Sequence, residues 1–137
     1  MKVLVADDSD VLRERIIGLF SDMDGIDVVG HAQAEPETFH AIDKFKPDAL
    51  ILDIQMILGR GIAVLSKIKQ ERPGMVVIIL TNFTALPYRK KCLEVGADFF
   101  LDKSTEIGKL REIIQSLSDR LNSEGKGHPT GFSELDS

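Results

Sequence analysis

Five short apolar runs divide the chain, and polar residues follow each of them. They lie at residues 3–6, 26–30, 49–52, 75–80 and 98–101. A run that leaves no polar face is typical of a strand that is covered on both sides. The second run is interrupted by Asp27 and is less apolar than the others, so it predicts a strand at the edge of a sheet.

Apolar residues between these runs recur every three or four positions, which predicts five amphipathic helices. Ser9 is a favourable N-cap for the first helix, and Pro36 and Pro87 suit the starts of the second and fourth. Ser104 or Thr105 is expected to cap the fifth helix. The expected inward-facing residues are Leu12, Ile16, Leu19 and Phe20; Thr38, Ala41, Ile42 and Phe45; Ile62, Leu65 and Ile68; Cys92 and Val95; and Ile107, Leu110, Ile114, Leu117 and Leu121.

The alternation of five strands with five helices predicts an α/β fold, with a parallel sheet covered on both faces and right-handed crossovers. The last apolar stripe spans barely two heptads, so packing onto the sheet is favoured over a coiled-coil seam. The chain has 137 residues, enough for one domain. We place this domain at residues 1–122. Residues 123–137 are rich in Ser, Glu, Gly, Lys, His and Pro, and we expect them to form a disordered tail.

Charge and cysteine content narrow the function classes. The formal net charge of −5 argues against a broad nucleic-acid-binding surface. Cys92 is the only cysteine, so no internal disulfide can form and nothing indicates secretion. The apolar run at residues 3–6 is too short for a signal peptide or a membrane span. We expect a cytoplasmic protein that binds neither nucleic acid directly nor membrane.

Acidic residues follow the first and third runs, and each has a structural and a functional interpretation. A buried carboxylate such as Asp53 is costly unless it is paired, metal-bound or chemically used, although an Asp that begins a loop is common. Asp7 and Asp8 precede a predicted helix. They can stabilise its N-terminus or hold a divalent cation, most favourably Mg²⁺.

Thr81 follows the fourth predicted strand and Lys103 the fifth. The carboxyl ends of parallel strands meet at one edge of a sheet, where α/β folds bind their ligands. The convergence of three carboxylates, a hydroxyl and an ammonium there favours a functional site. The carboxylates can hold Mg²⁺, and Asp53 can attack a phosphorus centre. Thr81 and Lys103 can then hold phosphoryl oxygens.

Five motifs together resemble the response-regulator receiver domain, over roughly residues 2–121. They are Val3-Leu4-Val5-Ala6-Asp7-Asp8-Ser9, Leu50-Ile51-Leu52-Asp53-Ile54-Gln55-Met56, Leu80-Thr81-Asn82, Gly96-Ala97-Asp98 and Phe100-Leu101-Asp102-Lys103. The resemblance implies a flavodoxin-like, doubly wound, five-stranded parallel sheet of order 2-1-3-4-5. It also implies a role in two-component signal transduction.

The resemblance further implies the chemistry of the site. Asp53 would accept a phosphoryl group from a sensor histidine kinase or a phosphotransfer protein. Mg²⁺ would be held by Asp8, Asp53 and the backbone carbonyl of Gln55, with Asp7 acting partly through water.

Thr81 and Phe100 match the hydroxyl and the aromatic ring that rearrange together on phosphorylation in this family. We expect Phe100 to move inward and to change a surface formed by the helix at Pro87–Val95, the last strand and the last helix. No helix-turn-helix pattern follows, so we expect no effector domain in this chain. That surface would then bind a separate downstream protein or a second copy of the chain.

Three positions depart from the family pattern. Ile57 replaces the usual proline, which would make the loop after Asp53 less rigid. Arg60 occupies a position that is often acidic and would change the charge near the site. Ser104 replaces the proline that typically follows Lys103, and a cis bond there would cost ~3 kcal/mol more than with proline. None of the three removes a reactive group.

Two rival functions are open. A phosphatase of the haloacid-dehalogenase type also uses an aspartate nucleophile, but it requires a second aspartate two residues later. This chain has Gln55 there, which cannot transfer protons in that role. A non-phosphorylated receiver-like adaptor is disfavoured because every reactive position is filled. We therefore expect no enzyme activity beyond the chain's own phosphotransfer and dephosphorylation.

Overall fold

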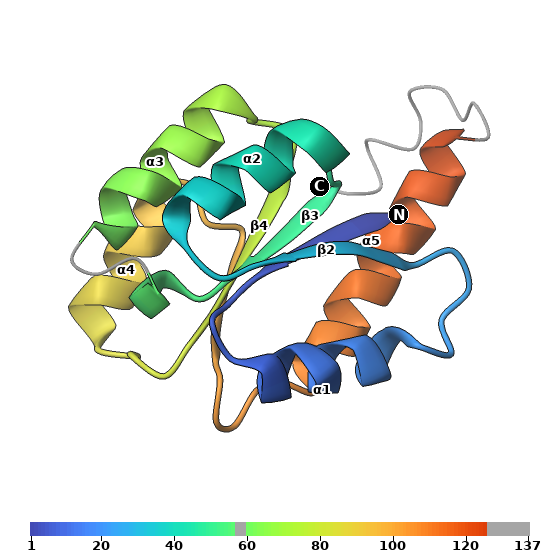
Figure 1. Ribbon diagram of the computed structural model, residues 1–137, viewed down its shortest axis with the longest axis horizontal. Helices are drawn as coiled ribbons and strands as arrows, with labels where there is room; N and C mark the ends of the chain where they lie inside the picture. Colours follow the sequence, from blue (N-terminus) through green and yellow to red (C-terminus); the bar gives the residue numbers. More distant parts are fainter. Residues whose placement is uncertain (57–59, 126–137) are drawn as a thin grey trace.

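The five predicted strands form one parallel sheet with the order β2-β1-β3-β4-β5 (Figure 1). The computed structural model describes residues 1–56 and 60–125. The strands are β1 (Lys2–Ala6), β2 (Asp27–Ala32), β3 (Ala49–Leu52), β4 (Val76–Thr81) and β5 (Phe99–Asp102). The predicted fold class and strand order are confirmed, because all four neighbouring strand pairs are parallel.

Five α-helices alternate with the strands, as predicted. They are α1 (Asp10–Phe20), α2 (Glu35–Phe45), α3 (Gly61–Glu71), α4 (Leu86–Glu94) and α5 (Lys109–Gly125), and a short 3₁₀ helix, η1 (Ile54–Met56), follows β3. The Ser9 side chain caps α1 by accepting a hydrogen bond from the Leu12 amide. Pro36 and Pro87 lie in the first turns of α2 and α4, where a missing backbone N–H costs nothing.

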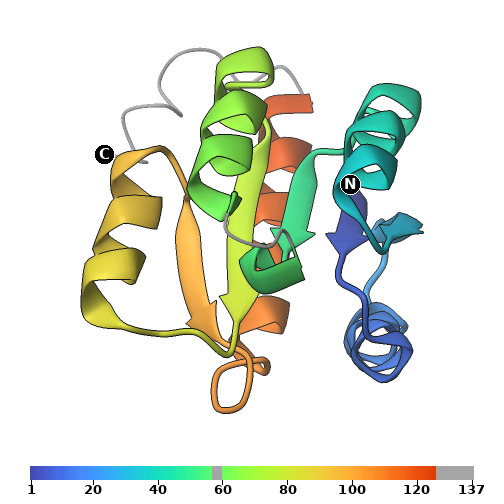
Figure 2. The ribbon, with the colours of Figure 1, turned by 60° about the vertical axis from the view of Figure 1, so that its left-hand side comes forward.

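The sheet lies between two layers of helices (Figures 1 and 2). It separates two apolar clusters. One lies under α2, α3 and α4 and contains Leu50, Leu52, Leu65 and Ile79. The other lies under α1 and α5 and contains Val5, Ile16, Ile78 and Leu110. Alternate strand residues therefore serve opposite faces, which is why β1, β3 and β4 carry apolar runs without a polar face.

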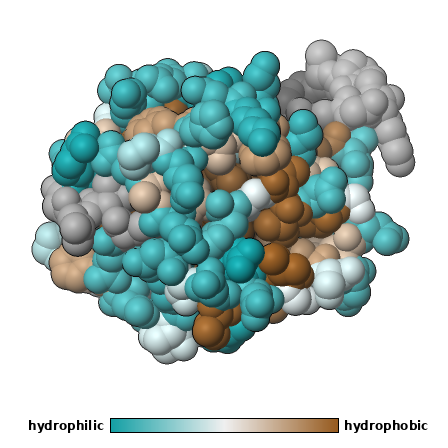
Figure 3. Space-filling view, viewed as in Figure 1, coloured by the Kyte–Doolittle hydropathy of each residue, from teal (hydrophilic) through white to brown (hydrophobic). Residues whose placement is uncertain are grey.

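β2 is an edge strand, as its weaker apolar pattern predicts. Four of its six residues are half-buried and one is exposed, whereas all four residues of β3 are buried. Figure 3 shows apolar side chains gathered over this edge of the sheet on a mainly hydrophilic face.

The prediction that Ser104 or Thr105 caps the last helix is wrong, because α5 begins at Lys109. The Ser104 amide and hydroxyl instead donate to Asp102 Oδ1, at 2.8 and 2.6 Å. Glu106 Oε1 accepts from the Asp102 amide at 2.9 Å, so residues 103–108 form hydrogen-bonded turns.

Most of the predicted last stripe packs onto the sheet. Ile107, Leu110 and Ile114 are buried and Leu117 is half-buried, whereas Leu121 is exposed. The helix continues to Gly125, three residues beyond the domain boundary that the sequence suggested. Residues 126–137 of the expected tail lie outside the described residues.

Candidate functional site

The carboxyl ends of β1, β3, β4 and β5 bring the predicted residues to one edge of the sheet. Asp7 and Asp53 each come one position after a strand, and their amides continue the backbone pairing by donating to Ala32 and Ala6, both at 2.9 Å. The Lys103 amide donates to the Thr81 carbonyl at the same distance. The side chains therefore start from fixed backbone positions rather than from free loops.

Lys103 joins the two buried carboxylates. Its Nζ lies 2.8 Å from Asp7 Oδ2 and 2.7 Å from Asp53 Oδ2. The side chains of Asp7, Asp53 and Lys103 are 3%, 7% and 15% exposed, so solvent screens these contacts only weakly. One cation thus offsets two like charges that would otherwise be costly to bury.

The pKa of Lys103 reflects this arrangement. Burial alone would lower it, but hydrogen bonds to Asp53 and Asp7, together with their charges, outweigh burial and raise the pKa above its ordinary value of 10.5. Lys103 is therefore a permanent cation at neutral pH.

Each buried carboxylate has its second oxygen held by the backbone. Asp7 Oδ1 accepts from the Ser9 amide at 2.8 Å, and Asp53 Oδ1 accepts from the Gln55 amide at 3.0 Å. The oxygens bound to Lys103 are consequently oriented, and only a side chain has to move for another ligand to reach them.

Asp8 completes an acidic cluster and, unlike Asp7, is exposed. Carboxylate oxygens of Asp7, Asp8 and Asp53 lie within 4.8 Å of one another. Opposite ligands of Mg²⁺ are about 4 Å apart, so small side-chain rotations would bring these oxygens around one ion. Oxygen is the donor type that Mg²⁺ prefers, so the cluster fits a divalent cation.

Thr81 and Gln55 are linked across the mouth of the site. The fully buried Thr81 donates from Oγ1 to Gln55 Oε1 at 3.1 Å, and the Phe83 amide donates to Thr81 Oγ1 at 3.2 Å. The Thr81 hydroxyl has a single proton, so it must leave Gln55 before it can donate to another ligand.

This site lies in a chain that matches the family model of the response regulator receiver domain over residues 3–115. The chain belongs to the response regulator receiver domain family. That membership bears out the resemblance based on the strand-end motifs.

Curated relatives agree with this assignment, and a solved structure shares the fold. The chain is 29% identical to the response regulator GacA of Pseudomonas syringae over 84% of its length and 54% of that protein. It is 33% identical to the uncharacterized transcriptional regulatory protein YhcZ of Bacillus subtilis over 80% of its length and 51% of that protein. The isolated receiver domain of RcsB from Salmonella enterica superposes with a TM-score of 0.79 at 21% identity, over 87% of this chain and 88% of that one. The chain thus spans about half the length of the curated relatives that it matches.

Phe100, the predicted switch aromatic of the receiver domain, is already buried. It is 4% exposed and belongs to the core cluster under α4. The Arg89 guanidinium lies over its ring, 5.5 Å from the centroid. The expected inward movement of Phe100 therefore needs revision, because the ring already occupies an inward position in this structure.

Two of the three departures from the family pattern fall within the described residues. Arg60 forms an ion pair with Glu35 at 3.0 Å, and its side chain is 66% exposed. Ser104 bonds to Asp102, and the described peptide bonds are all trans. Ile57 lies outside the described residues.

Sequence reasoning missed one residue that contacts the site, His31, and one whose side chain lies near the start of α3, Tyr88. His31 Nε2 lies 2.7 Å from the Asp7 carbonyl oxygen and helps to fix the acidic loop. His31 comes near the carboxyl end of β2, so applying the strand-end rule to every strand would have found it. Tyr88 extends from α4 toward the start of α3, and no local pattern marks it.

In the described part of the chain, no helix is long and apolar enough to cross a membrane.

Proposed function

We propose that this receiver domain is a phosphorylation-dependent signalling switch whose phosphoryl acceptor is Asp53. The observation that carries the proposal is the Asp53 Oδ2 atom, which is buried, oriented and held by a cation 2.7 Å away. The donor would be a histidine kinase or a phosphotransfer protein. Asp53 Oδ2 would attack phosphorus, the bond between phosphorus and the donor imidazole would break, and an acyl phosphate would form.

Other residues would stabilise the charge of the transferred group. Lys103 would pair with a phosphoryl oxygen, and Thr81 would donate its hydroxyl to another after leaving Gln55. Asp7, Asp8 and Asp53, with the Gln55 backbone carbonyl, would hold Mg²⁺. When bound, this ion would supply positive charge that stabilises the transferred group.

The outgoing signal would use α4, β5 and α5. Because Phe100 is already inward, we propose that phosphorylation stabilises this position by drawing Thr81 toward the phosphoryl group. Arg89 lies over Phe100, so a change in the ring's environment would reach the outer face of α4. The gain is the difference in partner affinity between two states, about 1–3 kcal/mol, which biases binding rather than creating it.

The occupant of that surface would be a separate downstream protein or a second copy of the chain. We further propose that the chain acts in the cytoplasm, binds nucleic acid only through partners, and catalyses nothing beyond its own phosphotransfer and dephosphorylation. The net charge of −5 supports the proposal that the chain binds nucleic acid only through partners. The switch would extend from residue 1 to the end of α5 at Gly125.

Intact-mass measurement after incubation with acetyl phosphate and Mg²⁺ tests the acceptor. We expect one added phosphoryl group in the wild type and none in Asp53→Asn. Asp48→Asn is the matched control, because Asp48 precedes the same strand that Asp53 follows. It should be phosphorylated normally. A phosphoryl group on Asp53→Asn would refute the assignment, and sustained hydrolysis of a phosphomonoester would favour the phosphatase instead.

A further inference from the structure

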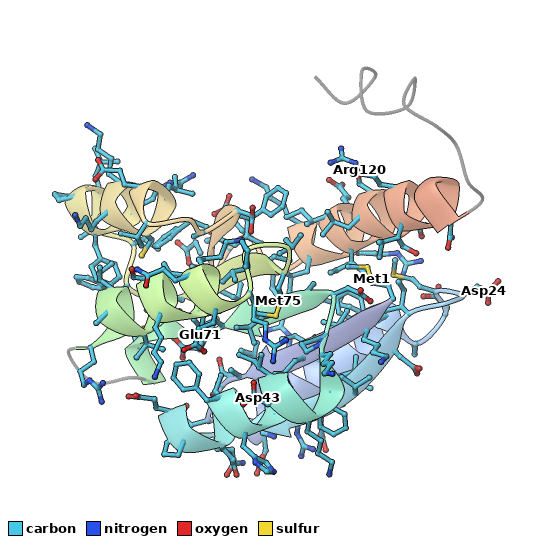
Figure 4. All side chains as sticks on the ribbon, turned by 90° about the horizontal axis from the view of Figure 1, so that it is seen from above. Met1, Asp24, Asp43, Glu71, Met75 and Arg120 are labelled. Atoms are coloured by element: carbon cyan, nitrogen blue, oxygen red, sulfur yellow. The ribbon has the colours of Figure 1, made fainter. Side chains whose placement is uncertain are left out.

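A groove of about 600 Å³ lies between α3 and α4. Figures 2 and 4 show these helices side by side, with α3 between α2 and α4. Half-buried Ile62, Tyr88 and Val95 provide apolar lining, and exposed Arg60 and Lys91 provide positive charge. Among the described residues, none that lines the groove is acidic.

The groove uses a different face of α4 from the surface that includes Phe100. Tyr88, Lys91 and Val95 follow three-four helical spacing and line the groove. Arg89 instead lies over Phe100 on the β5 side. The two surfaces therefore share a helix but have separate contact residues.

The charge of the groove stands out against the rest of the chain. The chain has 22 acidic and 17 basic residues, yet both charged residues that line the groove are basic. Arg60 also pairs with Glu35 at 3.0 Å, but its side chain is 66% exposed, and exposed pairs are weak enough to exchange partners. A carboxylate brought to this groove would meet two accessible cations.

We propose that the groove between α3 and α4 binds an acidic segment of a partner protein that carries an aromatic or aliphatic anchor. The anchor would pack against Ile62, Tyr88 and Val95, because buried apolar side chains provide most of the affinity at such sites. Flanking carboxylates would face Lys91 and Arg60, and these charges would orient the segment and speed its association. Docking requires neither phosphorylation of Asp53 nor the surface around Phe100.

The groove nevertheless touches the strand-end site through Gly61. A Cβ atom on Gly61 would lie 2.6 Å from the Tyr88 hydroxyl and closer still to the Ile54 side chain. Ile54 follows Asp53 directly, so a segment that displaces Tyr88 would disturb packing next to the acceptor.

A titration of the full chain with fluorescein-labelled peptides tests the proposal. The probe is a short synthetic peptide with Phe and Leu three residues apart among Asp and Glu. We expect saturable binding, shifts in the backbone NMR signals of Ile62, Ser66 and Val95, and weaker binding at higher salt. Peptides with Lys in place of Asp and Glu, or with Ser in place of Phe and Leu, should not saturate.

Two neighbouring lysines provide a matched pair of variants. Lys91→Glu should weaken binding roughly three- to tenfold, since it replaces an attraction by a repulsion. Lys90→Glu makes the same change at an exposed residue that does not line the groove and should leave affinity within about twofold. If both variants weaken binding equally, the effect depends on overall charge, and the groove is not the binding site.

Other occupants predict different results. If the groove signals shift with protein concentration in the absence of peptide, a second copy is the occupant and the proposal is wrong. If Phe132→Ala with Leu135→Ala shifts them, the chain's own C-terminal residues are the occupant, and the proposal is also wrong. Asp53→Asn should bind the probe normally, so failure of phosphorylation and failure of docking can be told apart.

Discussion

Aspartate side chains lie at both ends of the parallel sheet, but the two ends use them differently. At the amino ends, Asp48 Oδ2 accepts from the Lys2 amide of β1 at 2.7 Å. Asp98 Oδ2 accepts from the Val77 amide of β4 at 2.8 Å and from Lys69 Nζ at 3.1 Å. These carboxylates bind backbone donors at or near the starts of neighbouring strands.

At the carboxyl ends, Asp7 and Asp53 each give one oxygen to the backbone and the other to Lys103. A backbone donor is fixed by the sheet, whereas an ammonium on a flexible side chain can move to a new ligand. At the amino ends the bonded oxygen of Asp48 and of Asp98 is tied to a backbone amide, even where Lys69 shares it. At the carboxyl ends the Oδ2 atoms of Asp7 and Asp53 are bound by Lys103, so we expect these oxygens to be the ones that can bind metal or phosphoryl groups.

The largest expected effect tests the role of Lys103. Lys103→Met leaves two buried carboxylates without their cation, so we expect the free energy of unfolding to fall by about 3 kcal/mol at neutral pH. Urea denaturation measures this, and Mg²⁺ should restore part of the loss. A loss below about 1 kcal/mol would mean that the carboxylates are well solvated.

The same variant has a defined pH dependence. The folded-state pKa of Lys103 is raised, so its stabilisation is fully present below pH 10.5, its ordinary value, and is lost as pH rises through the folded value. The difference in unfolding free energy between wild type and Lys103→Met should accordingly shrink at the alkaline end of the range.

Mg²⁺ should stabilise the protein through the carboxylates at the carboxyl ends of the strands and not through those at the amino ends. At Mg²⁺ concentrations of 100 times the dissociation constant, the wild type should gain about 2.7 kcal/mol of unfolding free energy. Asp8→Asn should gain less at the same concentration because it lacks one ligand, while its metal-free form should be at least as stable as the wild type. Asp48→Asn should respond like the wild type. Equal Mg²⁺ affinity in Asp8→Asn would remove Asp8 from the site.

A smaller effect is expected at the amino ends. Asp98→Ala removes the acceptor of the Val77 amide and of Lys69, and should reduce the free energy of unfolding by about 1–2 kcal/mol. Phosphorylation by acetyl phosphate should be retained. Asp98→Asn keeps an acceptor oxygen, so its free energy of unfolding should fall less. Loss of phosphorylation in either variant would show that the carboxylates at the amino ends also support the phosphorylation site.

The smallest expected effect is the change in backbone NMR signals at residues distant from Asp53. Backbone NMR signals of Thr81, Arg89 and Phe100 should shift when beryllofluoride is added with Mg²⁺, whereas those of Lys2 and Val77 should stay almost constant. Shifts that remain confined to the loops around Asp53 would rule out the route through Phe100.

The carboxyl-end residues were predictable because parallel strands bring their ends together whatever the intervening sequence. Asp7, Asp53 and Thr81 directly follow apolar runs, and Lys103 lies two positions after the last run. The start of α5 was not predictable from capping rules. Side chains on both sides of the turn compete with helix formation, notably Asp102 and Glu106.

Side-chain contacts between different helices and strands could not be predicted from local sequence patterns. The hydrogen bond between Thr81 and Gln55 joins the end of β4 to η1, and Tyr88 reaches Gly61 across two helices. Periodicity identifies which residues face inward but not which side chains meet there. The contact between Arg89 and the Phe100 ring depends on such packing, which explains why it could not be predicted.

The weak anchoring of α4 has a consequence for the stability of individual helices. Cys92 is its one buried residue, whereas α3 buries Gly61, Val64, Leu65 and Ile68. We expect a helix with so few buried residues to unfold locally at a free energy below that of global unfolding, so its amides should exchange with solvent before those of α3. Both proposed surfaces include this helix. Ligands on either side could therefore communicate by suppressing the same local unfolding, without any change in the average structure.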